Sequence, residues 1–172
     1  MNIFDILFTI FINVISSIIF TVIFYYVLRP NIKISPFIVK NVKNGKELYQ
    51  FKIINRSFFP ANYVKMDLIL RKPEAVGYEK FNIKYIKQDI DLPYITRLYP
   101  VNFNKNVALY AVVVSTESNL SELLKDPLNT LEFTIDSQHS ISALSKIFVQ
   151  NYSTYRVIKE GVFSFGNNLK VT

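Results

Sequence analysis

The sequence predicts an all-β fold, an immunoglobulin-like β-sandwich, preceded by one N-terminal transmembrane α-helix. Two observations lead to this prediction: a long apolar run near the start of the chain, and short alternating apolar segments from residue 31 onward. Half of the 172 residues are apolar, and only 19% are charged. Glycine (4) and proline (7) are too few for a low-complexity chain. We therefore divide the chain into a membrane anchor, residues 1–29, and a sandwich domain, residues 30–172.

The apolar run from Ile3 to Leu28 contains a single charged residue, Asp5. As a helix it is about 39 Å long, enough to span a hydrocarbon core of about 30 Å. A cleaved signal peptide has a basic start and a small-residue cleavage site, and this run has neither. Arg29 and Pro30 end it at the expected water boundary. We expect an uncleaved transmembrane helix rather than a buried core helix.

Basic residues flank only one end of this run. Arg29, Lys33, Lys40 and Lys43 follow it, whereas only the α-amino group precedes it. The positive-inside rule then places the N-terminus outside and the sandwich domain in the cytoplasm. We expect a single-pass protein of the inner or cell membrane.

Polar residues gather on one face of the predicted membrane helix. At about 100° per residue they fall within an arc of about 160°. They are Asp5, Thr9, Asn13, Ser16, Ser17 and Thr21. An amide such as that of Asn13 costs about 1–3 kcal/mol when it is left unsatisfied in lipid. This face is therefore expected to meet protein or water, either by hydrogen bonding to a second copy or to the helix of a partner protein, or by lining a pore.

Strand patterns begin directly after the helix. The clearest is Tyr63 to Arg71, in which Val64, Met66 and Leu68 share one face. The β pattern opens with Ile32 and Ile34 and then 37–39. The other expected strands are 48–55, 81–86, 107–114, 131–135, 146–152 and 155–165, with an Asn44-Gly45 turn before 48–55. Ser118 to Lys125 instead has the pattern of one short helix, which stops before Pro127.

Several short motifs follow one another in a characteristic order. They are the strand 48–55 (LYQFKIIN), the strand 63–71, Ala108-Leu109-Tyr110, the strand 131–135 (LEFTI) and the segment 152–161. In this order they resemble the cytoplasmic domain of inward-rectifier potassium channels, with its F-R-x-x-N, L-L-R, P-L-Y, A-E-F-x-V and S-Y-x-x-x-x-I-x-W-G elements. The resemblance covers about residues 33–166. It implies an immunoglobulin-like sandwich, a tetramer-like assembly and a tendency to bind regulatory ligands.

The chain departs from that family in its membrane part. Those channels have two membrane helices around a pore loop with a T-V-G-Y-G-like filter, whereas this sequence has one such helix and no such loop. Glu160 stands near the place of the family's terminal Trp, and residues 104–107 replace its acidic turn. Potassium selectivity is therefore not carried over.

We find no catalytic motif in the sequence. The four glycines form no phosphate-binding loop, and a chain with no cysteine and one histidine has no thiolate or paired-histidine metal site. His139 is expected on a surface turn, and Asp89 and Asp91 in a solvated turn. We expect no enzyme activity, no cofactor, no bound metal and no nucleic-acid partner.

All 20 basic residues follow the apolar run, so the sandwich domain is strongly positive. Solubility and membrane topology alone account for such a charge. The functional interpretation is an anionic ligand, either a lipid headgroup or a small molecule such as a cyclic nucleotide. The candidate contacts are Arg29, Lys33, Arg71, Lys72, Lys84 and Lys87.

These features favour a non-enzymatic, self-associating membrane protein whose sandwich senses a ligand or partner and controls the membrane helix. A concrete form is a membrane-permeabilising effector of a bacterial nucleotide-signalling or antiviral defence system. The alternative is a structural adaptor or scaffold subunit that binds no ligand.

Overall fold

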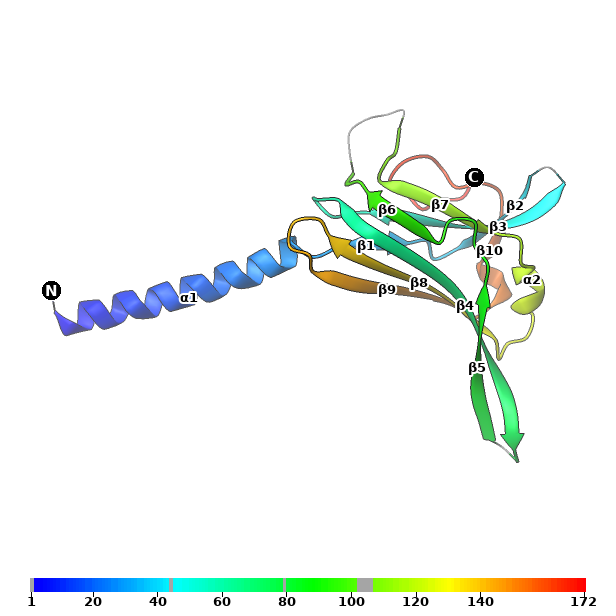
Figure 1. Ribbon diagram of the computed structural model, residues 1–172, viewed down its shortest axis with the longest axis horizontal. Helices are drawn as coiled ribbons and strands as arrows, with labels where there is room; N and C mark the ends of the chain where they lie inside the picture. Colours follow the sequence, from blue (N-terminus) through cyan, green and yellow to red (C-terminus); the bar gives the residue numbers. More distant parts are fainter. Residues whose placement is uncertain (1, 44, 79, 102–106) are drawn as a thin grey trace.

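Helix α1 (Ile3–Val27) extends away from the β domain (Figure 1). The computed structural model describes residues 2–43, 45–78, 80–101 and 107–172, and every residue of α1 is exposed in it. The backbone N–H of Asn2 donates to the Asp5 carboxylate at 3.2 Å and so caps the first turn. A helix with no buried residue is not a core helix, and α1 is long and apolar enough to span a membrane.

One five-stranded sheet is organised around β3. Within the described residues its strands are β1 (Ile32–Ile34), β2 (Ile38–Lys43), β3 (Lys46–Asn55), β7 (Ala111–Thr116) and β10 (Ile158–Glu160). Strand β7 pairs with β3 along one edge, while β1 and β2 share the other edge. Strand β10 runs parallel to β2, with Ile158 opposite Ile38. This pairing brings the C-terminal part of the chain next to the strands that follow α1.

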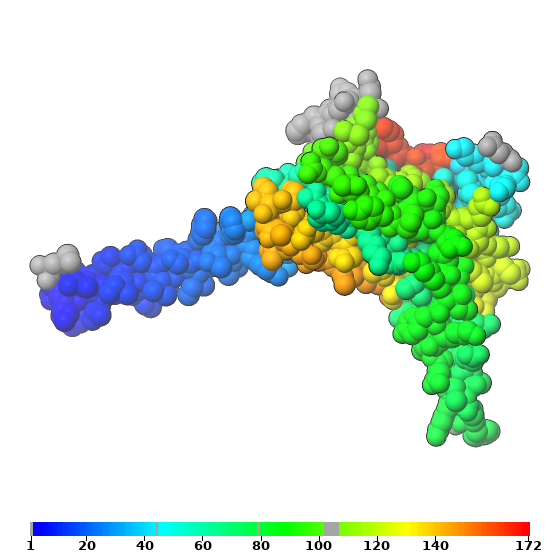
Figure 2. Space-filling view, in the orientation of Figure 1, coloured from blue at the N-terminus to red at the C-terminus, as the bar shows by residue number. Residues whose placement is uncertain are grey.

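The second five-stranded sheet is organised around β4. Its described strands are β4 (Ala61–Gly77), β5 (Lys80–Gln88), β6 (Tyr94–Leu98), β8 (Thr130–His139) and β9 (Ser145–Tyr152). Strand β8 pairs with β4 only as far as Arg71, beyond which β4 pairs with β5 alone. The far halves of β4 and β5 therefore leave the body of the domain as a two-stranded arm (Figures 1 and 2).

The core lies between the two sheets. Phe51 of β3 stacks on Phe133 of β8, with ring centres 4.9 Å apart. The predicted inward face of β4 is confirmed, because Val64, Met66 and Leu68 are fully buried. Two sheets around a shared core, preceded by one helix, confirm the predicted fold class.

Local signals located most elements, with three differences. Helix α2 (Leu120–Leu123) forms where expected, and the Asn119 side chain accepts from the Glu122 N–H at 3.1 Å. Strand β6 was not predicted, since it is short and flanked by prolines on both sides. Strand β7 begins at Ala111 rather than at residue 107. The predicted turn residue Asn44 and residues 104–106 lie outside the described residues.

The third difference is in the expected strand 155–165. A 3₁₀ turn, η1 (Tyr155–Val157), precedes β10, which ends before Gly161. Gly161 has φ +133°, and a Cβ there would come within 2.4 Å of the Thr172 carbonyl oxygen. The strand is therefore interrupted by a close backbone approach that needs glycine.

Candidate functional site

The polar face of α1 divides into residues that serve the helix itself and residues that do not. The hydroxyls of Thr9 and Thr21 donate to the carbonyls of Asp5 and Ser17, one turn earlier, at 2.7 and 2.8 Å. Asp5 caps the first turn. The positions of these three side chains are therefore explained by hydrogen bonds within α1 itself.

Asn13, Ser16 and Ser17 remain. Among the described residues, no hydrogen bond involves any of their side chains, and Asn13 and Ser17 border a shallow hollow on the helix surface. The Asn13 amide has two donor hydrogens and one acceptor oxygen, and none of them has a hydrogen-bond partner among the described residues. Asn13 is therefore the polar residue of α1 with the greatest unmet hydrogen-bonding capacity.

The end of α1 is joined to the sandwich through its backbone. Leu28 is buried, and its carbonyl accepts a hydrogen bond from the hydroxyl of Ser142, in the loop between β8 and β9. Asn31 is held on both sides: its N–H donates to Ser57 Oγ at 2.7 Å, and its carbonyl accepts from the Arg56 N–H at 2.7 Å. Segments from both sheets therefore hold the backbone at the C-terminal end of α1.

His139 lies in this junction, and the prediction that it occupies a surface turn is wrong. The side chain is 1% exposed, and its Nδ1 accepts from the N–H of Ser142 at 3.3 Å. Burial lowers the pKa of His139. A sequence signal for its position was present, because the alternation of Leu131, Phe133 and Ile135 continues through the polar end of β8.

The six predicted basic contacts fall into separate places. Arg29 lies at the helix exit with its guanidinium 4.2 Å from the centre of the Tyr26 ring, as expected at a membrane interface. Lys33 lies on β1, and the other four lie on the β4–β5 ladder of the second sheet. The structure therefore does not bring the six residues together.

Three of the four ladder residues have carboxylate partners. Arg71 pairs with Glu132 at 3.4 Å. Lys84 pairs with Glu74 at 3.8 Å, and Lys87 with Asp67 at 2.6 Å. Lys72 lies opposite Lys84 in the ladder. Because most of this charge is balanced locally, the ladder is a weak candidate for an anion site.

Lys33 instead joins three basic residues that sequence reasoning did not select. Lys33, Arg56, Lys159 and Lys170 border a hollow of about 580 Å³, called here the basic hollow. Its described lining contains no aspartate or glutamate. Because the four cations come from β1, the segment after β3, β10 and the C-terminal segment, no local motif predicts their meeting.

A buried lysine holds the rim of the basic hollow. Lys52 on β3 is 3% exposed, and its ammonium donates to the carbonyls of Ser164 and Asn168 at 2.6 and 2.8 Å. Desolvation lowers the pKa of Lys52. Lys52 thus fastens the C-terminal segment that carries Lys170 against the outer face of β3.

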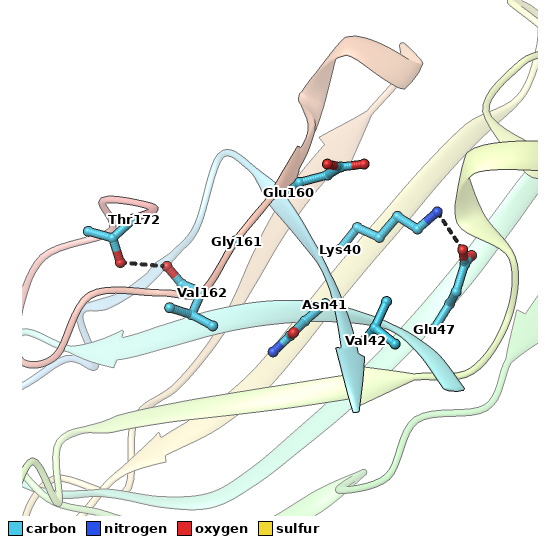
Figure 3. A pocket seen from close by; sticks show the side chains of 8 residues that line it. All are labelled: Lys40, Asn41, Val42, Glu47, Glu160, Gly161, Val162 and Thr172. Carbon is cyan, nitrogen blue, oxygen red and sulfur yellow. Dashed lines mark hydrogen bonds and ion pairs between the residues drawn. The ribbon is translucent and has the colours of Figure 1, made fainter. Parts of the chain in front are cut away.

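A second hollow, of about 430 Å³, has the opposite character (Figure 3). Lys40 forms an ion pair with Glu47 at 2.7 Å, and this hydrogen bond raises the pKa of Lys40. Glu160 lies on the same hollow, and the hydroxyl of Thr172 donates to the Val162 carbonyl at its rim. With two carboxylates around one lysine, this hollow does not attract an anion.

The described residues contain no group of three or more His, Asp or Glu side chains placed to hold a metal ion. No protein-family model and no curated protein matches this chain in sequence. The arrangement offers hydrogen bonding along one face of α1, a direct backbone link from α1 to the sandwich, and a cationic surface beside that link.

Proposed function

We propose that this chain is a non-enzymatic, single-pass membrane protein that self-associates through the polar face of α1. Its N-terminus lies outside, and its sandwich lies in the cytoplasm, where it senses an anionic ligand or a partner and controls the helix. The positive flank after α1 supports this topology. The resemblance of residues 33–166 to the sandwich of inward-rectifier channels supports an oligomeric, ligand-sensing role.

The observation that carries the proposal is the Asn13 amide in an apolar helix. In lipid its donors and oxygen would be left without partners, at a cost of about 1–3 kcal/mol. A second copy of α1 removes this cost, because two Asn13 side chains can donate to each other across the helix interface. Ser16 and Ser17 lie beside Asn13 and let the two backbones approach closely.

The junction supports control of the helix by the sandwich. Leu28 is tied to the β8–β9 loop, and Asn31 to the segment that follows β3. A ligand that shifts either segment changes the angle or rotation at which α1 leaves the domain. In an oligomer such a change repacks the polar faces, and a membrane-permeabilising effector of a nucleotide-signalling or antiviral defence system acts in this way.

A scaffold role is the second candidate, and the arm of β4 and β5 favours it. Tyr78, Phe81 and Tyr85 on the arm are each at least 60% exposed. Isolated two-stranded hairpins are marginally stable in water. Apolar residues on such an arm are typical of a surface that a protein partner covers.

Self-association is tested by cross-linking, for which the absence of cysteine is an advantage. Thr9→Cys places a thiol on the polar face, and Phe11→Cys places one on the opposite face. In membranes, oxidation is expected to cross-link the Thr9→Cys chain and to leave the Phe11→Cys chain monomeric. Adding Asn13→Leu should weaken the association about three- to thirtyfold, whereas the control Ile15→Leu should not change it.

Equal cross-linking from both faces, or association unchanged by Asn13→Leu, would refute this interface. A membrane-potential dye in bacteria that express the chain then separates effector from scaffold. Depolarisation under a ligand or partner condition supports the effector, and its absence under every condition favours the scaffold.

A further inference from the structure

We infer that the basic hollow binds the phosphate group of a small anion, either a soluble phosphate ester or a phospholipid headgroup. This inference rests on the proposed function, since it names the chemical class of the ligand that the sandwich senses. Its volume of about 580 Å³ lies in the range of about 300–1,000 Å³ that is usual for small-molecule sites.

The alternation of side chains along β10 places a cation and a carboxylate in two different hollows. Lys159 borders the basic hollow, and its neighbour Glu160 borders the second hollow with Lys40. Successive side chains of a strand point to opposite faces, so β10 directs its cation to one hollow and its carboxylate to the other. The four cations of the basic hollow therefore repel one another with no described carboxylate between them, and a bound phosphate removes that repulsion.

Two of the four cations are held in place, and two are available. A guanidinium nitrogen of Arg56 donates to the Asn167 carbonyl at 3.5 Å, and Lys159 Nζ lies 3.5 Å from the centre of the Phe37 ring. Among the described residues, no hydrogen bond or ion pair involves the ammonium of Lys33 or of Lys170. Lys33 and Lys170 are thus the cations that a phosphate would engage, beside a guanidinium with further free donors.

Two residues, Arg56 and Lys33, connect the hollow to the end of α1. The side chain of Arg56 borders the hollow, while its backbone N–H holds the Asn31 carbonyl at 2.7 Å, three residues after Leu28. Lys33 lies on β1, two residues after Asn31. A phosphate bound between Lys33 and Arg56 therefore draws together the two segments that fix the exit of α1.

Inorganic pyrophosphate is the probe, because it has the phosphate groups common to both candidate ligands but neither a nucleotide base nor a lipid chain. The full chain is placed in nanodiscs of phosphatidylcholine and titrated in a calorimeter. Saturable binding is expected, and Lys33→Gln with Lys170→Gln should weaken it about tenfold or more. The control is Lys72→Gln with Lys84→Gln, which removes the same charge from the arm and should leave the affinity close to that of the original chain.

Arg56→Gln is a second variant and should also bind pyrophosphate more weakly. Its circular dichroism spectrum must match that of the original chain, which shows that the variant is folded. Phosphatidylglycerol added to the nanodiscs distinguishes the sources: pyrophosphate affinity falls if a headgroup occupies the hollow and stays unchanged if the ligand is soluble. The inference is overturned if pyrophosphate does not bind, or if the hollow and arm variants weaken binding equally. Helix cross-linking through Thr9→Cys is read in the same samples, so a failed site is distinguished from failed self-association.

Discussion

Replacing Lys52 with methionine is expected to loosen the C-terminal segment and to weaken anion binding. Methionine keeps the apolar stem of the lysine but removes the ammonium that donates to Ser164 and Asn168. Both carbonyls then lose a charged donor. Because this segment carries Lys170, losing the two hydrogen bonds also frees one of the four cations that border the basic hollow.

Two opposing effects set the free energy of unfolding that Lys52→Met is expected to cost. Hydrogen bonds from a charged donor contribute about 1.5–3 kcal/mol each. Against this, the buried ammonium pays for desolvation, which is the reason that its pKa is lowered. Ser164 and Asn168 are half-buried, so water reaches their carbonyls in the variant and recovers part of the loss. We expect a net cost of about 1–3 kcal/mol, which lowers Tm by about 2–12 °C for a domain of this size.

The assay is thermal unfolding of the full chain in detergent, followed by circular dichroism. Lys65→Met, at an exposed lysine of β4, is the control and should change stability by less than about 0.5 kcal/mol. A second readout is pH dependence. The pKa of Lys52 is lowered in the folded chain, so the unfolded chain binds more protons just below pH 10.5, and stability from this group rises with pH there. A Lys52→Met variant with unchanged Tm and an unchanged alkaline slope would refute the reasoning.

Three further changes test the core and the junction. Phe133→Ala removes a fully buried ring stacked on Phe51 and should cost about 3–5 kcal/mol in denaturant unfolding. Tyr152→Phe deletes a buried hydroxyl that donates to the Ser35 carbonyl at 2.6 Å, and a loss below about 0.5 kcal/mol would contradict the expected cost of about 1–3 kcal/mol. Burial lowers the pKa of His139 from 6.5, so the unfolded chain is protonated first and stability should fall as pH drops through 6.5. In melts taken across this range, His139→Gln should reduce that fall, and an equal fall in both chains would count against the assignment.

Structural features that depend only on residues close together in the sequence could be predicted from the sequence. The apolar run of α1, the alternation of Val64, Met66 and Leu68, and the Asn119 cap of α2 are local patterns with local physical causes. The burial of His139 was also accessible, because alternation from Phe133 onward places it on the core face. The polar residues next to His139 make the alternation hard to recognise in the sequence.

The burial of β3 on both faces was not predictable from alternation. Phe51 and Ile53 face the core, whereas Lys52 and Ile54 lie on the opposite face of the strand. The C-terminal segment covers Lys52 through hydrogen bonds that join residues more than 100 positions apart. A lysine in a strand is expected in water, and only the fold decides that backbone carbonyls replace that water.

Local sequence patterns predict a helix long and apolar enough to span a membrane, a polar stripe along that helix, a β-sandwich and a strong positive charge on the domain. Each follows from composition and period, which act over a few residues. Which cations meet depends instead on contacts between segments that are far apart in the chain. The parallel pairing of β10 with β2 and the hold of Lys52 on the C-terminal segment bring Lys159 and Lys170 to Lys33 and Arg56. The ladder lysines meet carboxylates instead, because strand register, and not net charge, chooses the partner of each side chain.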